Sequence, residues 1–472
     1  MFNAFAKIMN HKSEMVSSSM WNMDHETILK YLNEVTELLA EYSWIYNVRN
    51  TDIFLHDVLE KIPSEWCESL MDLPWKDLNQ LPFGFIKEDW PEMLKTFIKK
   101  CCDLGSFRFP KSNLQETKVQ VKTFVNKNTP RKKQLEIKIM SILIEEICKN
   151  LECNYVLDIG SGLGYLDQAL HHNCGVKCIG LDSVPAYTDA AVSRLKDDPC
   201  SKALYHMTVK VENSAICLSE VRTALLNAYN KDLTCSCKIS SCANGSFNKS
   251  CLNPVLMVGL HCCGNLMQDM MSIFSQMDEL KAFVCVGCCY NKINLSNFPM
   301  SNTAKFSVKA ACKDSICWYP CISGLRLGSH ATRSEWVSLS EEILSYRERS
   351  LAFRAVLQYY TAKENKVWKR PKRRLRKPDL TDFQSYCNKM LGEDFKEGTL
   401  EKLNMFYLQK QHLFPRIRIL LVLQLLLQPL WEAFVTIDRM LFFRENSIFA
   451  ECFALWDDKI SPRNIVLCAY KT

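Results

Sequence analysis

The sequence predicts an α/β protein with a mostly parallel, doubly wound sheet and helical extensions at both ends of the chain. From Tyr155 onward, apolar runs of strand length alternate with helical patterns, which implies parallel strands joined by crossover helices. A glycine-rich turn follows the first of these runs, and an acidic residue ends the second. The flanking regions instead carry the apolar period of helices.

The length of 472 residues suits two to three domains. We predict a helical N-terminal region over residues 1–110, a polar linker over 111–128, the α/β domain over 129–345 and a helical C-terminal region over 346–472. Within the α/β domain, residues 232–254 are rich in Ser, Asn, Cys and Lys and are interpreted as a surface insertion.

The elements are expected in the following order. A strong amphipathic helix leads into the sheet, because apolar residues recur every four positions at Leu135, Ile139, Leu143 and Ile147. Five strands follow, with helical patterns between most of them, and the chain turns helical beyond Glu335. The expected strands cover residues 155–158, 176–181, 203–211, 255–260 and 282–287.

Composition is that of an ordinary globular protein, with 47% hydrophobic and 24% charged residues. Several of the 24 cysteines lie in apolar strands, where a reduced thiol serves as a small hydrophobic group. The first 22 residues lack the apolar core of a secretion signal, so a cytoplasmic or nuclear, not secreted, protein is expected. A mitochondrial targeting sequence is the less favoured alternative, because the first 22 residues contain no arginine.

One segment accounts for the net charge of +7. Residues 366–377 carry eight basic residues, Trp368 and no acidic residue, so the rest of the chain is near neutral. Such a run suits contact with nucleic acid or with an import receptor, and a solvated loop is the equal alternative.

No transmembrane span is expected. Residues 418–430 are very apolar, but the uninterrupted apolar run falls short of the ~18–20 residues that a span needs. Gln424, Gln428 and Glu432 recur every four residues and form a polar stripe. A buried helix packed on the sheet domain is the better interpretation.

The turn after the first strand reads Asp158-x-Gly160-x-Gly162-x-Gly164, and the second strand ends in Asp182. A carboxylate at that position is placed to accept hydrogen bonds from ribose hydroxyls. The turn is neither G-x-G-x-x-G nor a phosphate-binding loop, which disfavours dinucleotides and nucleoside triphosphates. The pair indicates a different adenosine-containing cofactor, and the alternative is an α/β domain whose first turn is merely rich in glycine.

Reactive side chains follow the fourth and fifth strands, whose carboxyl ends meet at the rim that holds the glycine turn. His261 is a candidate general base, or it orders its loop, and Tyr290 is a second catalytic candidate. Cys263, Cys288 and Cys289 are candidate acceptor or cofactor contacts. No metal site is predicted at this rim, because adjacent cysteines lack C-x₂₋₄-C spacing. A weak zinc signal lies in the insertion, at Cys235, Cys237, Cys242 and Cys251.

With these motifs in place, the chain resembles the methyltransferase-like protein 25 family and, more distantly, transfer RNA 2′-O-methyltransferases of the Trm-thirteen type. The resemblance extends nearly end to end and includes the motifs Ile62-Pro-Ser-Glu-Trp66, Pro130-Arg-Lys-Lys-Gln-Leu-Glu136, Asp158-Ile-Gly-Ser-Gly-Leu-Gly164, Gly259-Leu-His-Cys-Cys-Gly264, Val286-Gly-Cys-Cys-Tyr290, Phe298-Pro-Met-Ser301, Arg354-Ala-Val-Leu-Gln358, Asp438-Arg439 and Ser461-Pro-Arg-Asn464.

The resemblance implies a Rossmann-like class I methyltransferase core that uses S-adenosyl-L-methionine. It implies that Asp158, Gly160, Gly162, Gly164 and Asp182 bind this cofactor, and that Lys132, Lys133 and Glu136 contact cofactor or acceptor. Asn265 departs from the family pattern, which has aspartate there, and so removes a carboxylate from the rim.

The sequence therefore favours a methyltransferase that modifies RNA or protein. No N-P-P-[YF] signature of adenine amino-nitrogen methylation follows the fourth strand. The alternative is a methyltransferase fold kept as a non-catalytic scaffold or binding protein, and Asn265 is the residue in its favour.

Overall fold

The computed structural model divides the chain into two compact units. Unit 1 comprises residues 1–32, 108–309 and 433–472, and unit 2 comprises residues 33–107 and 310–432. The residues that the structure describes are 24–107, 109–112, 114, 129–196, 198, 200–230, 254–312, 317–330, 332–366, 375–391 and 398–471.

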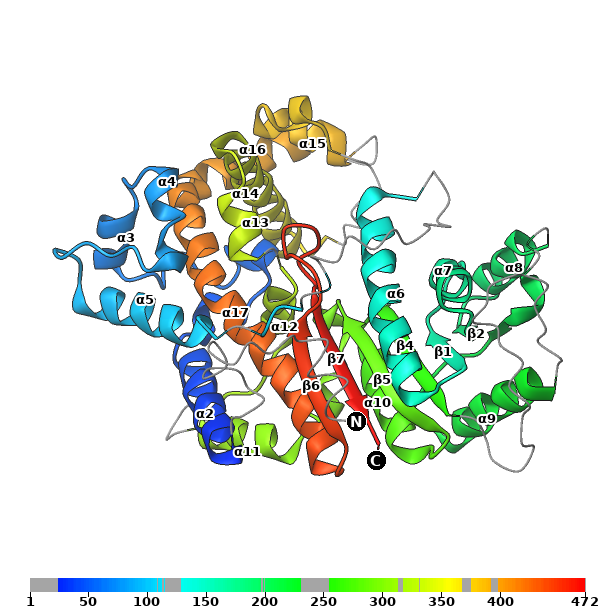
Figure 1. The fold of residues 1–472 in the computed structure, drawn as a ribbon. Coiled ribbons are helices and arrows are strands. Elements are labelled where there is room, and N and C mark those ends of the chain that lie inside the picture. Colours follow the sequence, from blue (N-terminus) through cyan, green and yellow to red (C-terminus); the bar gives the residue numbers. More distant parts are fainter. Residues whose placement is uncertain are drawn as a thin grey trace. The chain divides into compact units, whose positions relative to one another are not determined.

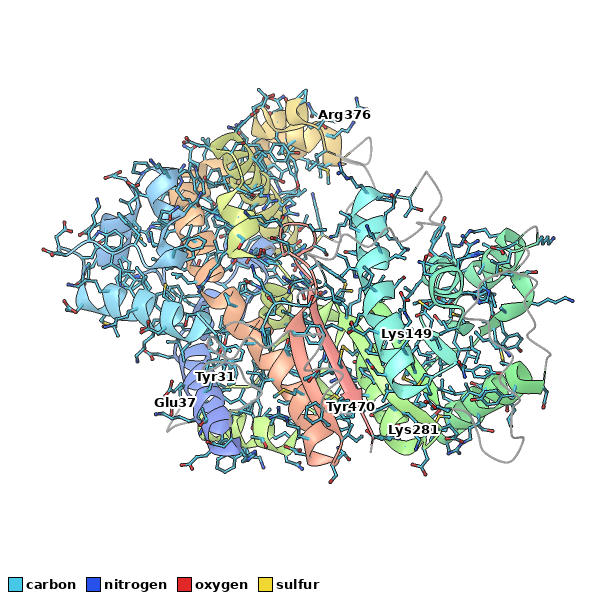
Figure 2. All side chains as sticks on the ribbon, in the orientation of Figure 1. Tyr31, Glu37, Lys149, Lys281, Arg376 and Tyr470 are labelled. Carbon is cyan, nitrogen blue, oxygen red and sulfur yellow. The ribbon has the colours of Figure 1, made fainter. Side chains whose placement is uncertain are left out.

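Unit 1 is built on a seven-stranded sheet in the order β3-β2-β1-β4-β5-β7-β6. All pairs among β1 to β5 are parallel, and β7 runs antiparallel to both β5 and β6. Near one end of that junction Ala282 pairs with Tyr470, which Figure 2 labels together with Lys281. The strands are β1 (Tyr155–Ile159), β2 (Lys177–Asp182), β3 (Leu204–Thr208), β4 (Val255–Cys262), β5 (Leu280–Gly287), β6 (Phe449–Ala454) and β7 (Ile465–Tyr470).

Helices cover both faces of this sheet. On one face, α6 and α7 share a buried core with apolar side chains of β1, β2, β4, β5 and β7, and Figure 1 shows α6 lying along the strands. On the other, Phe274 of α10 and Phe443 of α17 pack against Phe283 of β5, with ring centroids 5.2–5.6 Å apart. The helices of unit 1 are α6 (Arg131–Leu151), α7 (Tyr165–Cys174), α8 (Pro185–Arg194), α9 (Ala215–Asn230), α10 (Asn265–Gln276) and α11 (Asn302–Ala310). The predicted Rossmann-like α/β class is confirmed.

Unit 2 is helical over its described residues. Its helices are α2 (His25–Glu41), which starts in unit 1, α3 (Ser64–Leu70), α4 (Trp75–Leu78), α5 (Glu92–Gly105), α12 (Ile322–Gly328), α13 (Arg333–Val337), α14 (Glu341–Lys363), α15 (Phe383–Leu391), α16 (Thr399–Lys410) and α17 (Phe414–Glu445), which continues into unit 1. Aromatic side chains fill its interior, and Trp431 packs edge-on against Tyr46.

The apolar segment near residue 420 is a buried helix. The stretch Thr399–Glu445 passes a length and composition test for a membrane span, but 83% of its most apolar window is buried within the protein. In unit 2, the Gln424 amide nitrogen donates to the Ile45 carbonyl (2.9 Å) and to Asn50 Oδ1 (2.8 Å). The polar stripe of this helix therefore joins it to neighbouring segments. The expected packing of residues 418–430 on the sheet domain is wrong, because they belong to unit 2; the helix enters unit 1 at Ala433, and its Phe443 packs against Phe283 of β5.

The C-terminal region requires a correction, because it is not wholly helical. After α17, β6 and β7 complete the sheet of unit 1. β7 is a continuous apolar run of six residues, and β6 is apolar except for the buried Glu451. Neither shows the alternation of a half-exposed strand, so periodicity alone did not separate them from buried helix.

The expected domain boundaries also differ from the observed units. The start of the expected linker belongs to unit 1, since the Ser112 hydroxyl donates to the Leu455 carbonyl at 3.1 Å. Unit 1 also ends at residue 309 and resumes at 433, instead of running continuously to 345. The rest of the linker from 115, nearly all of the insertion and residues 367–374 of the basic run lie outside the described residues.

Candidate cofactor pocket and catalytic rim

The turn after β1 is shaped by three glycines in the left-handed region, with φ of +73° at Gly160, +57° at Gly162 and +69° at Gly164. Side chains disfavour this region, which explains the glycines. No atom lies within 4 Å of the point where a Gly162 Cβ would stand. The backbone there is consequently open to close approach by a ligand.

Asp182 fixes this turn to the end of β2. Its carboxylate accepts hydrogen bonds from the backbone N–H of Gly162 at 3.0 Å and of Val184 at 2.9 Å. The side chain stays partly exposed and lines a pocket. Since each carboxylate oxygen carries two lone pairs, Asp182 can still accept hydrogen bonds from a ligand.

Asp158 lies beneath the turn instead of facing the pocket. It is only 2% exposed and does not line the pocket. Burial, and next the neighbouring charge of Asp167, raise the pKa of Asp158 well above its usual value. A protonated carboxyl can donate a hydrogen bond to Asp167, so this position supports the turn from below. Its predicted contact with cofactor stays a prediction.

The pocket has a volume of about 830 Å³ and lies at the carboxyl ends of the strands. It opens where the strand order reverses, between β1 and β4, which is the usual ligand position in doubly wound sheets. Its lining comprises Ile159, Gly160, Leu181, Asp182, Ser183, residues 209–214, Cys263, Asn265, Leu266, Gln268, Asp269, Ser272, Asn297 and Met300.

His261 is paired with Glu136 of α6. Its Nε2 lies 2.7 Å from Glu136 Oε2, and the imidazole is 32% exposed whereas the carboxylate is 2% exposed. Burial acts to raise the pKa of Glu136, but the hydrogen bond and charge of His261 outweigh it, and the pKa is lowered. His261 also has φ of +65°, a strained conformation for a residue with a side chain. The Glu136 contact fixes the orientation of the imidazole, and neither His261 nor Glu136 lines the pocket.

Three thiols meet beside His261. Cys263 Sγ lies 3.0 Å from Cys288 Sγ, which is 3.5 Å from Cys289 Sγ. Hydrogen bonding from Cys288 is the main reason that the pKa of Cys263 falls to about 5, and the charge of Lys292 acts in the same direction. Of the three, Cys263 lines the pocket. The fold brings together these three cysteines, which the sequence placed after two different strands.

Tyr290 is 3% exposed and does not line the pocket. Two guanidinium groups lie near its ring, with the Cζ atoms of Arg439 and Arg463 at 5.1 and 6.0 Å from its centroid. This placement gives Tyr290 a packing role, and a catalytic role for it stays a prediction.

The two lysines before β1 are exposed at the start of α6. Lys133 Nζ lies 5.4 Å from the centroid of Tyr165, the first residue of α7 after the glycine turn, and the charge of Lys132 acts on Glu136. Neither lysine lines the pocket.

Asn265 begins α10 and lines the pocket. Its Oδ1 accepts a hydrogen bond from the backbone N–H of Asn294 at 2.7 Å. An aspartate could accept the same bond, so what this position lacks is charge.

The sequence did not indicate the residues that fix the pocket wall around Met300. Asp438, in the last part of α17, accepts hydrogen bonds from the backbone N–H of Met300 (2.9 Å) and of Ser301 (2.8 Å) and from the Ser301 hydroxyl (2.8 Å). About two helical turns later, Glu445 accepts from the N–H groups of Asn302 (2.7 Å) and Thr303 (2.9 Å). The motifs Phe298–Ser301 and Asp438–Arg439 had indicated two family segments, and only the fold shows that they meet.

Among the described residues, two groups have metal-ligating atoms close together: Cys263 with Cys288 and Cys289, and His172 with Asp198 and Cys200. In the second group, Asp198 already accepts hydrogen bonds from Gln168 (2.6 Å) and from the backbone N–H of Cys200 (2.8 Å), and His172 Nε2 lies 3.0 Å from it. Because these contacts already engage Asp198 and His172, we interpret the second group as a local structural network. The four cysteines of the insertion lie outside the described residues.

Comparison with known proteins agrees with this geometry. Residues 132–296 match the family model described as a methyltransferase domain. The chain is 29% identical over 238 residues to the probable methyltransferase-like protein 25 of Homo sapiens, covering 47% of this chain and 37% of that protein. It is 25% identical over 242 residues to the Mus musculus protein of that name, covering 47% and 38%. The matched region therefore spans less than two fifths of these relatives.

Proposed function

We propose that this chain, which carries a methyltransferase domain and is related to methyltransferase-like protein 25, is an S-adenosyl-L-methionine-dependent methyltransferase acting on RNA or protein. One observation carries the proposal: Gly160 of the left-handed glycine turn and Asp182, which holds that turn at Gly162, line one pocket at the switch point of the sheet.

The residues present fit such a cofactor. Gly162 leaves the backbone uncovered, Gly160 lines the pocket, and Asp182 offers unused lone pairs to ribose hydroxyls. When bound, S-adenosyl-L-methionine supplies an electrophilic methyl group on a sulfonium centre. The protein's task is then to position the acceptor in line with that group and to remove its proton where necessary.

His261 is the base that we propose. With the Glu136 carboxylate accepting from Nε2–H, the imidazole keeps its lone pair on Nδ1, which can take a proton from an acceptor hydroxyl or amine. Glu136 then stabilises the resulting imidazolium and acts as a positioning residue.

The acceptor polymer is proposed as RNA or protein, and the basic run at 366–377 slightly favours RNA. We also propose a reducing cytoplasmic or nuclear compartment. Every cysteine in the described part of the chain is a free thiol, and several, such as Cys178 and Cys285, are fully buried in the core of unit 1.

The second candidate function is a non-catalytic scaffold, and Asn265 favours it. At this position the pocket presents a neutral amide where the family pattern has a carboxylate. A scaffold would keep the pocket and cofactor affinity without turnover.

Binding comes first in the test. The full chain should bind S-adenosylhomocysteine in calorimetry, and Asp182→Ala should abolish the measurable heat. Asp189→Ala removes an exposed carboxylate on α8 and serves as the matched control, with unchanged affinity expected. Equal affinity in the Asp182→Ala variant and the wild type would overturn the cofactor site.

Turnover is tested with tritiated S-adenosyl-L-methionine and cell extract. Label that enters product with wild type but not with Asp182→Ala shows catalysis, and loss of the label after ribonuclease or protease identifies the polymer. Binding without label in any product would favour the scaffold.

A further inference from the structure

The thiols of Cys263, Cys288 and Cys289 form a compact group whose convergence neither the cofactor pocket nor the core explains. Their sulfur atoms all lie within 4.8 Å of one another, and all three residues are partly exposed instead of buried in the core. Two of the three follow β5 and one follows β4, so the cluster forms only when these strands pair.

The backbone is distorted in a way that builds this group. The register of β4 against β5 shifts between Leu260 and Cys262. His261, inside that shift, has φ of +65°, which re-aims the residues that follow it. Gly264 then closes the turn, with its N–H 3.2 Å from the Cys289 carbonyl. A strained residue and a register shift beside clustered thiols are backbone irregularities of the kind found at functional sites.

The spacing of the sulfur atoms suits a shared metal ion. Two thiolates on one tetrahedral zinc ion, each about 2.3 Å from the metal, stand about 3.8 Å apart. The observed separations of 3.0 and 3.5 Å are shorter than that value by less than 1 Å, and the third is at most 4.8 Å, so small side-chain movements would let the three sulfur atoms share one ion. A covalent disulfide needs about 2.05 Å, which none of these pairs has.

We propose that Cys263, Cys288 and Cys289 bind a thiophilic metal ion, zinc(II), at the rim of the pocket. Three protein ligands leave a fourth position for water or a substrate group, as in catalytic rather than structural zinc sites. Cys263 itself lines the pocket, so the metal would lie beside it. The C-x₂₋₄-C rule missed this site because its ligands come from two strands.

Lys292 supports the proposal through charge. Three thiolates around one divalent ion leave a net charge of −1, and the Lys292 ammonium is a neighbouring positive charge that acts on Cys263 and Cys289. The site does not depend on the proposed methyl transfer, because a scaffold could hold the same ion.

The first test is metal analysis of the full chain, purified without metal-affinity steps. Wild type should carry zinc by inductively coupled plasma mass spectrometry, and Cys288→Ser should lose one ion per chain. The Cys235→Ser/Cys237→Ser variant separates any zinc held in the insertion, and Cys317→Ser controls for loss of an exposed thiol. Zinc content that is identical in wild type and Cys288→Ser would overturn the proposal.

The second test needs no substitution at the cluster, so it stands even if Cys288→Ser fails to fold. Metal-free wild type is alkylated with and without added zinc, and modified cysteines are identified by peptide mass spectrometry. Zinc should protect Cys263, Cys288 and Cys289 but not Cys317. Equal labelling in both samples, or an intact mass that shows a Cys263–Cys288 disulfide in place of metal, would contradict the site. S-adenosylhomocysteine binding, measured on the same samples, reports separately on the cofactor pocket.

Discussion

Gly162 and Gly164 share the left-handed backbone region, but only Gly164 has a neighbour close to the position of its missing side chain. A Cβ on Gly164 would stand 2.7 Å from His206 Cε1, whereas none of the surroundings comes within 4 Å at Gly162. His206 is held beside the buried carboxylate of Asp167, with 3.7 Å between Nδ1 and Oδ2. The two glycines therefore have different surroundings: Gly162 faces open space, whereas Gly164 leaves room for the His206 side chain.

This contrast gives a matched pair of substitutions. Gly162→Ala should cost about 1–2 kcal/mol of stability from backbone strain alone. Gly164→Ala should cost roughly 1–3 kcal/mol more, because His206 must also move. Urea unfolding followed by circular dichroism compares the two, and equal midpoints would show that His206 does not constrain the turn.

Asn265→Asp tests whether the missing carboxylate limits turnover. The aspartate can keep the hydrogen bond from the Asn294 N–H, so the fold and affinity for S-adenosylhomocysteine should stay unchanged. Transfer of label to product should increase if a rim carboxylate assists deprotonation of the acceptor. An increase in label without any change in cofactor affinity is the expected result, and no label in either protein contradicts a catalytic role for this position.

At the scale of elements, the last part of α17 secures the pocket wall through Asp438. Burial is the main reason that the pKa of this carboxyl rises from its usual value to about 6, and the hydrogen bonds from residues 300 and 301 act in the opposite direction. Because the pKa of the folded state lies above that of the unfolded state, the contribution of Asp438 to stability is greatest below about pH 4 and is lost as pH rises to about 6.

Asp438→Asn removes this titration and places an amide N–H₂ group among N–H donors. The variant should be less stable than wild type by about 1–3 kcal/mol. The difference should narrow by about 1 kcal/mol between pH 5 and pH 7, since only wild type loses stability over that interval. Urea unfolding at the two pH values measures the difference, and a gap that does not change with pH would contradict the assignment. Affinity for S-adenosylhomocysteine should also fall, because Met300 lines the pocket.

The elements that the sequence predicted well are those whose patterns are local. The four-residue recurrence from Leu135 to Ile147 became α6, and the run before Asp158 became β1. The strands β6 and β7 were missed because both are buried and lack the alternation of a half-exposed strand, which leaves them hard to distinguish from buried helix. The Glu136–His261 pair joins residues 125 positions apart, and no local pattern encodes such a contact.

At the scale of the whole molecule, both units are discontinuous in sequence. The matched methyltransferase domain ends at residue 296, yet the sheet that carries it is completed by strands after residue 448. A domain boundary placed at residue 345 from the order of sequence patterns therefore separates β6 and β7 from their sheet. The chain returns to pair β7 with the edge of β5 that β4 leaves free, and no local pattern marks this return.

Two fragments test whether residues 129–345 or the segments of unit 1 form the folding unit. Fragment 129–345 lacks β6, β7, Asp438 and Glu445, and leaves β5 as a long apolar edge, so it should aggregate. A fragment that joins 108–309 to 433–472 through a flexible linker restores the edge pairing and both carboxylates, and should remain soluble. Size-exclusion chromatography with calorimetric titration of S-adenosylhomocysteine compares them. If fragment 129–345 were monomeric and bound this ligand as tightly as the full chain, then β6 and β7 would be dispensable for the pocket, and unit 1 would not be the folding unit.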